Sequence, residues 1–194
     1  MRREVVLDTL SVLLITYAAI VFAYGTTLIN ENQQYAMFCV IGEGLLLLGL
    51  VLGGIVHGYM LRNKVGGEVI YYGSVGVALV AIAQVPVVLV GLSIYPLSVG
   101  AVGRVLFLTA QAVAEELFFA NYIYAYLART ARMIHANVAT ATIFMVFHWA
   151  VYAQHPVVLL VVFMSRLALN WTYTKGGLGA SMLSHFIVNL VAGM

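Results

Sequence analysis

The most informative part of the chain is VLFLTAQAVAEELFFANYIYAYL, residues 105–127. It is long enough to cross a bilayer, because a transmembrane helix needs about 20 mostly apolar residues. It also carries two adjacent carboxylates, Glu115 and Glu116, near its middle. A charge at the centre of a bilayer costs about 2.5–3.5 kcal/mol on insertion scales, so such a group usually faces a partner or a water-filled cavity. The stretch therefore predicts a transmembrane helix that lines a polar site.

The rest of the chain shares the apolar character of this stretch. Of its 194 residues, 63% are hydrophobic and 8% are charged, whereas soluble domains contain about 25% charged residues. Short polar breaks divide the chain into seven apolar segments, which are residues 5–29, 35–61, 69–97, 105–127, 136–153, 156–174 and 177–194. We therefore expect an all-α, polytopic transmembrane bundle of about seven helices that forms a single membrane domain over residues 1–194.

The positive charges predict how the bundle sits in the membrane. With a cytoplasmic amino terminus, the basic residues of the loops and termini fall on the cytoplasmic side, with the exception of Arg104. These residues are Arg2, Arg3, Arg62, Lys64, Arg129, Arg132 and Lys175. We expect a multi-pass protein of the cell membrane, and no nucleic-acid partner, because no dense basic run is present. Cys39 is the single cysteine, which excludes an intramolecular disulfide.

Polar side chains in three of the apolar segments converge at one depth. A helix rises about 1.5 Å per residue, which puts Glu115, His148 and Asn189 each about 18 Å from the cytoplasmic end of its segment, and His185 about 12 Å. His185 and Asn189 are spaced i,i+4 and share one face of a helix. We predict that these four residues line one water-accessible cavity near the middle of the membrane.

This combination of side chains fits the hydrolysis of a peptide bond. Glu115 and His148 could polarise a water, whereas His185 and Asn189 can donate hydrogen bonds to the oxyanion of a tetrahedral intermediate. A zinc site stays open as an alternative, because Glu115, His148 and His185 form a His₂Glu set, although no HExxH helix is present. Glu116 points about 100° away from Glu115 on a helix, so only one of the two carboxylates is expected to face the cavity.

Three short motifs in this part of the chain resemble those of a known family. They are Glu115-Glu116 with a following aromatic residue, Phe144-Met145-Val146-Phe147-His148, and His185-Phe186-Ile187-Val188-Asn189. In order and spacing they resemble the CAAX protease and bacteriocin-processing (CPBP or Abi) family of intramembrane endopeptidases, whose motifs are EExxxR, FxxxH and HxxxN/D. The resemblance covers about residues 108–192 and implies a catalytic core over about residues 105–194.

The resemblance also implies a mechanism and a class of substrate. Glu115 and His148 would activate the attacking water, His185 and Asn189 would stabilise the oxyanion, and no metal cofactor would be needed. The best-understood relatives are the type II CAAX prenyl endopeptidases, which remove the last three residues of prenylated proteins. The implied partners are therefore a peptide or protein substrate, prenylated in the CAAX-type case, and the lipid bilayer.

The chain departs from the family pattern at position 120. The arginine of EExxxR is replaced by Ala120, and Asn121 follows where glycine is common. Arg166 is the one basic residue deep in a later segment, so we predict that it pairs with Glu116 in place of the motif arginine, the alternative being that it snorkels to an interface. The missing arginine also leaves open a non-catalytic membrane protein on the same scaffold, either a bacteriocin immunity-type partner or a small transporter.

Overall fold

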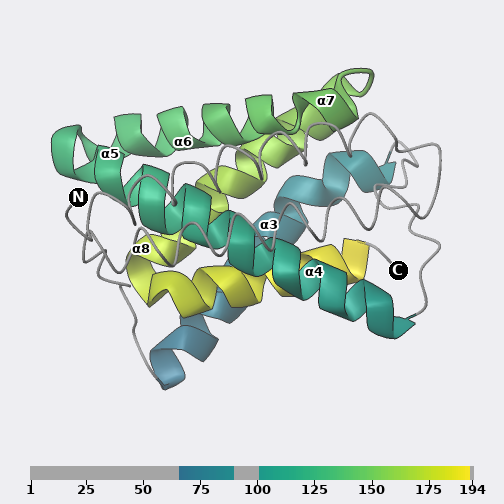
Figure 1. Ribbon diagram of the computed structural model, residues 1–194, viewed down its shortest axis with the longest axis horizontal. Coiled ribbons are helices and arrows are strands. Elements are labelled where there is room, and N and C mark those ends of the chain that lie inside the picture. Colours follow the sequence, from purple (N-terminus) through teal and green to yellow (C-terminus); the bar gives the residue numbers. More distant parts are fainter. Residues whose placement is uncertain (1–65, 90–100, 193–194) are drawn as a thin grey trace, which may run out of the picture. The chain divides into compact units, whose positions relative to one another are not determined.

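The computed structural model describes residues 66–89 and 101–192, and every element in these ranges is a helix (Figure 1). The chain divides into two compact units: of the described residues, 101–117 belong to unit 1, and 66–89 and 118–192 belong to unit 2. The predicted all-α class is confirmed for this part of the chain. The segments 5–29 and 35–61, with Cys39, lie outside the described residues. The count of seven helices, the single membrane domain and the cytoplasmic amino terminus therefore stay predictions.

The segment 105–127 is helical, but its hydrogen-bonding pattern changes in the middle. Helix α4 (Ala101–Glu115) runs directly into a π-helix, η2 (Glu116–Tyr124), which is followed by α5 (Ala125–Thr130). The change from α to π falls between the two adjacent carboxylates. π-helical turns are rare and occur frequently at functional sites, so the change marks this pair as a place where the backbone departs from the regular pattern.

Two helices occupy the predicted segment 136–153. They are α6 (Met133–Phe147) and α7 (Trp149–Tyr152), and His148 lies between them. The backbone N–H of His148 still donates to the carbonyl of Phe144 at 3.2 Å. His148 therefore sits at the carboxyl end of α6, where the chain leaves the regular helix.

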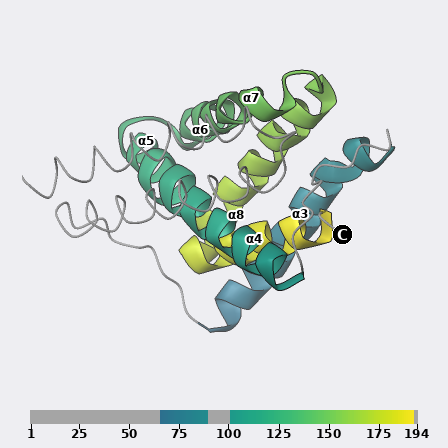
Figure 2. The same cartoon turned by 45° about the vertical axis from the view of Figure 1, so that its right-hand side comes forward.

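Helix α8 (Pro156–Ala192) has a sharp bend at Gly177, where φ is 80° and ψ is −175°. This backbone conformation is essentially restricted to glycine. The two arms, residues 156–176 and 178–192, fold back on each other (Figures 1 and 2). Ser181 in the second arm donates a hydrogen bond to the carbonyl of Leu169 in the first at 3.2 Å. The predicted break between the segments 156–174 and 177–194 is confirmed for the described residues, which end at Ala192, and it lies two residues past Lys175.

Helix α3 (Gly67–Leu89) packs against both arms of α8 through two glycines. A Cβ atom on Gly76 would lie 2.5 Å from the hydroxyl of Thr172 in the first arm and would also collide with the hydroxyl of Ser184 in the second. Ser184 in turn donates a hydrogen bond to the carbonyl of Gly73 at 2.8 Å. The absence of a side chain at Gly73 and Gly76 therefore permits the close approach, as small residues do where membrane helices meet.

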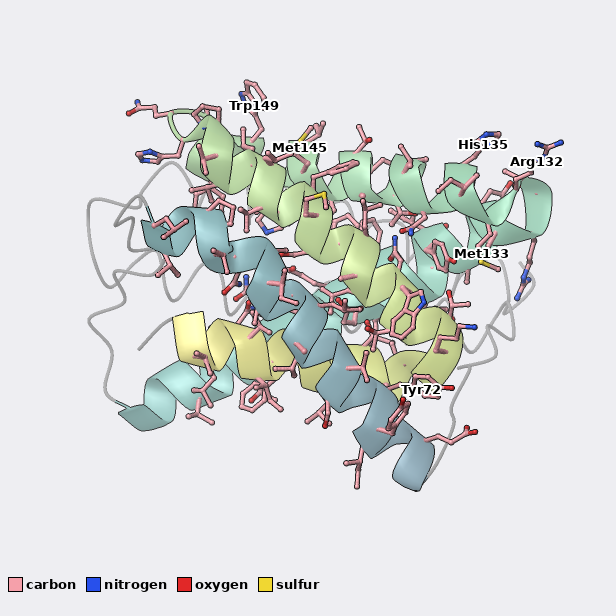
Figure 3. The ribbon with its side chains drawn as sticks, turned by 180° about the vertical axis from the view of Figure 1, so that it is seen from behind. Tyr72, Arg132, Met133, His135, Met145 and Trp149 are labelled. Carbon is pink, nitrogen blue, oxygen red and sulfur yellow. The ribbon has the colours of Figure 1, made fainter. Side chains whose placement is uncertain are left out.

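Two of the described helices, α3 and α8, are long and apolar enough to cross a membrane. Pro86 lies inside α3, which continues to Leu89. Large apolar side chains remain exposed on these helices, among them Ile82 and Leu160. Trp149 is also exposed, and Figure 3 shows it near one end of α6, with Arg132 and His135 near the other. This distribution fits the predicted lipid-facing bundle.

Replacing Gly76 by Ala is expected to destabilise the protein by about 1–3 kcal/mol, because the added methyl group overpacks the contact with Thr172 and Ser184. Thermal unfolding in detergent measures the change. Gly67→Ala is the matched control, since nothing lies within 4 Å of the Cβ position there. An unchanged melting temperature for Gly76→Ala would show that α3 does not dock at this position.

Candidate active site

Phe144 is the centre of a polar cluster in unit 2. Its buried ring lies 4.3 Å from the ring of His148 and 6.4 Å from the ring of His185, measured between centroids. Phe119 from η2 stands edge-on to the same ring at 4.7 Å. The two histidines that the sequence places on separate helices are therefore brought onto one aromatic side chain.

The hydrogen bond of His148 fixes which ring nitrogen carries its proton. Its Nδ1 lies 2.8 Å from the carbonyl oxygen of Phe144. A carbonyl oxygen only accepts, so Nδ1 must be the protonated nitrogen. In the neutral imidazole the lone pair is then on Nε2, which is the nitrogen that can accept a proton. His148 is stacked on Tyr152 with the two rings 3° from parallel, so its orientation is constrained from a second side.

His185 and Asn189 lie one turn apart in the second arm of α8, and both are buried. Within the described residues, the Nδ2 of Asn189 has no hydrogen-bond partner. A buried donor without a partner lowers the stability of the folded state by about 1–3 kcal/mol, which indicates that such a group is kept for function. A donor held in this state can serve an oxyanion that exists only during the reaction.

Arg166 is completely buried in unit 2 and does not extend to the surface. Its Nε donates to the Oδ1 of Asn170 at 2.9 Å, and the Nδ2 of Asn170 donates to the Oδ1 of Asn137 at 2.8 Å. The guanidinium carbon lies 5.4 Å from the centroid of Phe144, within the range of a cation–π contact. Arg166 therefore joins the same aromatic ring as the two histidines.

The two carboxylates, Glu115 and Glu116, are buried at the α-to-π junction. The Nε2 of Gln111 donates to the Oε1 of Glu115 at 3.0 Å, one turn earlier on α4. Both carboxylates belong to unit 1. The predictions that Glu115 shares a cavity with the histidines, and that Glu116 pairs with Arg166, therefore stay predictions.

Position 120, where the family motif has arginine, holds a fully buried alanine in the π-helix. A longer side chain at Ala120 would have to displace its neighbours, because packed interiors leave little free volume. The next residue has a structural partner, since the hydroxyl of Tyr173 donates to the Oδ1 of Asn121 at 3.1 Å. The two departures from the family pattern are thus accommodated in the packing of η2 against α8.

A family model described as type II CAAX prenyl endopeptidase Rce1-like matches residues 97–191. Over these residues, which are just under half of the chain, the protein is similar to the Rce1-like family. The matched region contains all three motifs, so the predicted resemblance to the CAAX proteases is confirmed. No curated protein and no solved structure matches the chain.

Three polar residues of this Rce1-like region were not predicted from the sequence: Gln111, Asn137 and Asn170. Each is an uncharged amide inside an apolar segment. Such residues carry no charge and so do not stand out in an apolar segment, although an amide buried in a membrane helix also needs hydrogen-bond partners. Phe144 was noticed as part of a motif, but its contact with both histidines depends on the fold.

The zinc alternative for the Rce1-like site stays a hypothesis. In the part of the chain that the structure describes, no group of three or more His, Cys, Asp or Glu side chains is arranged to hold a metal ion. Metal analysis of the purified protein tests it directly.

Replacing Arg166 by Met is expected to destabilise the protein by about 2–4 kcal/mol. Met keeps most of the volume but leaves the buried Oδ1 of Asn170 without its donor and removes the cation–π contact. Thermal unfolding in detergent gives the change. Arg129→Met makes the same substitution at an exposed site and should have little effect. Equal melting temperatures for the two variants would contradict a structural role for the network.

Proposed function

We propose that this Rce1-like protein is an intramembrane endopeptidase that hydrolyses a peptide bond with an activated water. The Rce1-like family is a membrane-embedded protease family. The observation that carries the proposal is the position of His148 and His185 on one buried ring, Phe144, with the Nε2 of His148 as the basic nitrogen. General bases and oxyanion donors need this kind of fixed orientation.

In the proposed mechanism, Glu115 is the general base and takes a proton from the water, which His148 helps to polarise, as the water oxygen attacks the carbonyl carbon. His185 and Asn189 donate hydrogen bonds to the oxyanion that forms. When the C–N bond breaks, the proton held by Glu115 passes to the leaving amine, so the products are an amine and a carboxylic acid, which then loses its proton to become a carboxylate. Among the described residues the Nδ2 of Asn189 has no hydrogen-bond partner, which supports its role as an oxyanion donor.

The proposed substrates are peptides or proteins that reach the site from the bilayer, including CAAX-type chains with a prenylated cysteine. The exposed apolar residues on α3 and α8 are compatible with a lipid surrounding, through which a prenyl group could approach. The non-catalytic alternative, an immunity-type partner or transporter, is favoured by one observation, the buried Ala120 in place of the motif arginine.

Cleavage of a defined peptide set by the purified full chain in detergent or nanodiscs tests the proposal. The set pairs prenylated CAAX peptides with the same peptides lacking the prenyl group, and mass spectrometry identifies the products. Metal analysis and a chelator are included. We expect cleavage, no stoichiometric metal and no effect of the chelator. Cleavage of no peptide would favour the non-catalytic alternative, and stoichiometric zinc needed for cleavage would replace the metal-free mechanism.

A further inference from the structure

Gln111 is a buried amide in unit 1, and within the described residues only its nitrogen makes a hydrogen bond. It lies on α4, one turn before Glu115, and is 8% exposed. Its Nε2 donates to the Oε1 of Glu115 at 3.0 Å. Because an ionised carboxylate only accepts hydrogen bonds, this contact orients the amide with its nitrogen toward Glu115 and its oxygen away.

The oxygen of this amide is the unusual atom. Within the described part of the chain, the Oε1 of Gln111 has no hydrogen-bond partner, although it is buried. The amide could satisfy the carboxylate with its nitrogen alone, so nothing in the contact with Glu115 explains an acceptor at this place. A buried acceptor without a partner points to a ligand that supplies a donor, and a water is the smallest such ligand.

A water that is activated by a carboxylate has two hydrogens to place. One goes to the general base, and the other needs a second acceptor if the lone pair of the oxygen is to be aimed at the substrate. The Oε1 of Gln111 is such an acceptor, and it belongs to the same amide group as the Nε2 that donates to Glu115. The pair therefore offers two acceptors to a single water, and fixing the orientation of a nucleophile in this way lowers the barrier to its attack.

From this arrangement we propose that Gln111 is a water-positioning residue: its nitrogen holds Glu115 and its oxygen accepts a hydrogen from the water that Glu115 activates. This inference rests on the proposed function, because it needs Glu115 to act as the base. It adds a second acceptor for the nucleophile and assigns a role to an amide outside the three motifs.

The test is Gln111→Met in the full chain, assayed with a peptide that the unmodified protein cleaves. Met keeps the length of the side chain and removes both polar ends. We expect kcat to fall about 10- to 100-fold, the effect of losing a hydrogen bond to a charged or reacting group, while KM changes less than about 3-fold. Gln154→Met removes an amide at an exposed position and should leave both constants unchanged. If Gln111→Met does not fold, Gln111→Asn keeps the amide but retracts it by one methylene and should also lower kcat.

A double substitution distinguishes positioning from a structural role. If Gln111 acts through the water of Glu115, adding Gln111→Met to Glu115→Gln should change the residual rate by less than about 3-fold, because residues that act as a unit are not additive. If the rate losses of the two single substitutions multiply in the double variant, the inference is overturned. A raised KM with unchanged kcat in Gln111→Met would also overturn it, because it would mean that the oxygen binds a substrate N–H. Full activity of Gln111→Met beside an inactive Glu115→Gln would refute this inference alone. Full activity of Glu115→Gln would instead refute the proposed function.

Discussion

Replacing Glu115 by Gln is expected to lower kcat by about 10²- to 10⁴-fold and to leave the protein folded. Gln has the shape of Glu and can keep a hydrogen bond to the amide of Gln111, but it cannot take a proton from water. Because Gln has the same shape as Glu, it fills the buried position of Glu115 with little change in packing. Peptide cleavage gives kcat and KM, and thermal unfolding in detergent reports the folded state.

The matched control for Glu115→Gln is Glu68→Gln, the same chemical change in the exposed first turn of α3. It should keep full activity and stability. Full activity of the Glu115→Gln protein would remove Glu115 from the mechanism. Loss of activity together with loss of folding would contradict the expectation that the effect lies in the chemistry.

Replacing Asn189 by Leu is expected to lower kcat by about 10²- to 10³-fold, the usual effect of removing one oxyanion donor. The same substitution should keep or raise the melting temperature. The Nδ2 of Asn189 is buried without a partner among the described residues, so an apolar side chain of similar size removes an unfavourable group. Opposite signs for activity and stability are typical of a residue retained for function.

Gln154→Leu is the control for this change, because it removes an amide from an exposed turn. Neither its activity nor its stability should differ from that of the unmodified protein. A lower melting temperature for Asn189→Leu would show that the asparagine stabilises the fold. Unchanged kcat would exclude it as an oxyanion donor.

Much of the helical fold follows from the sequence because the bilayer restricts what an apolar segment can do. Segment lengths and polar breaks predicted the helices now seen as α3, α6 and α8, including the interruption next to Gly176. The change to a π-helix at Glu116 was not predicted. Apolar periodicity does not distinguish i→i+4 from i→i+5 hydrogen bonds, since both leave the segment apolar and satisfy its backbone.

The candidate site was predicted in part. Depth along the helices selected His148 and His185, and the fold brings both onto Phe144. Depth says nothing about rotation around a helix axis, so it could not reveal that Phe144 is the shared neighbour. It could not reveal the tautomer of His148 either, which depends on a backbone carbonyl within the last turn of α6.

The bend at Gly177 has a consequence for how the protein is assembled during synthesis. Helix α3 is held by both arms of α8, and its hydrogen bond from Ser184 to Gly73 joins residues 111 positions apart. The ribosome therefore completes α3 long before the second arm exists. Contacts so distant in sequence close late, and membrane helices can insert first and associate afterwards. We therefore expect α3 to remain without this contact in the bilayer until the second arm of α8 has been synthesised.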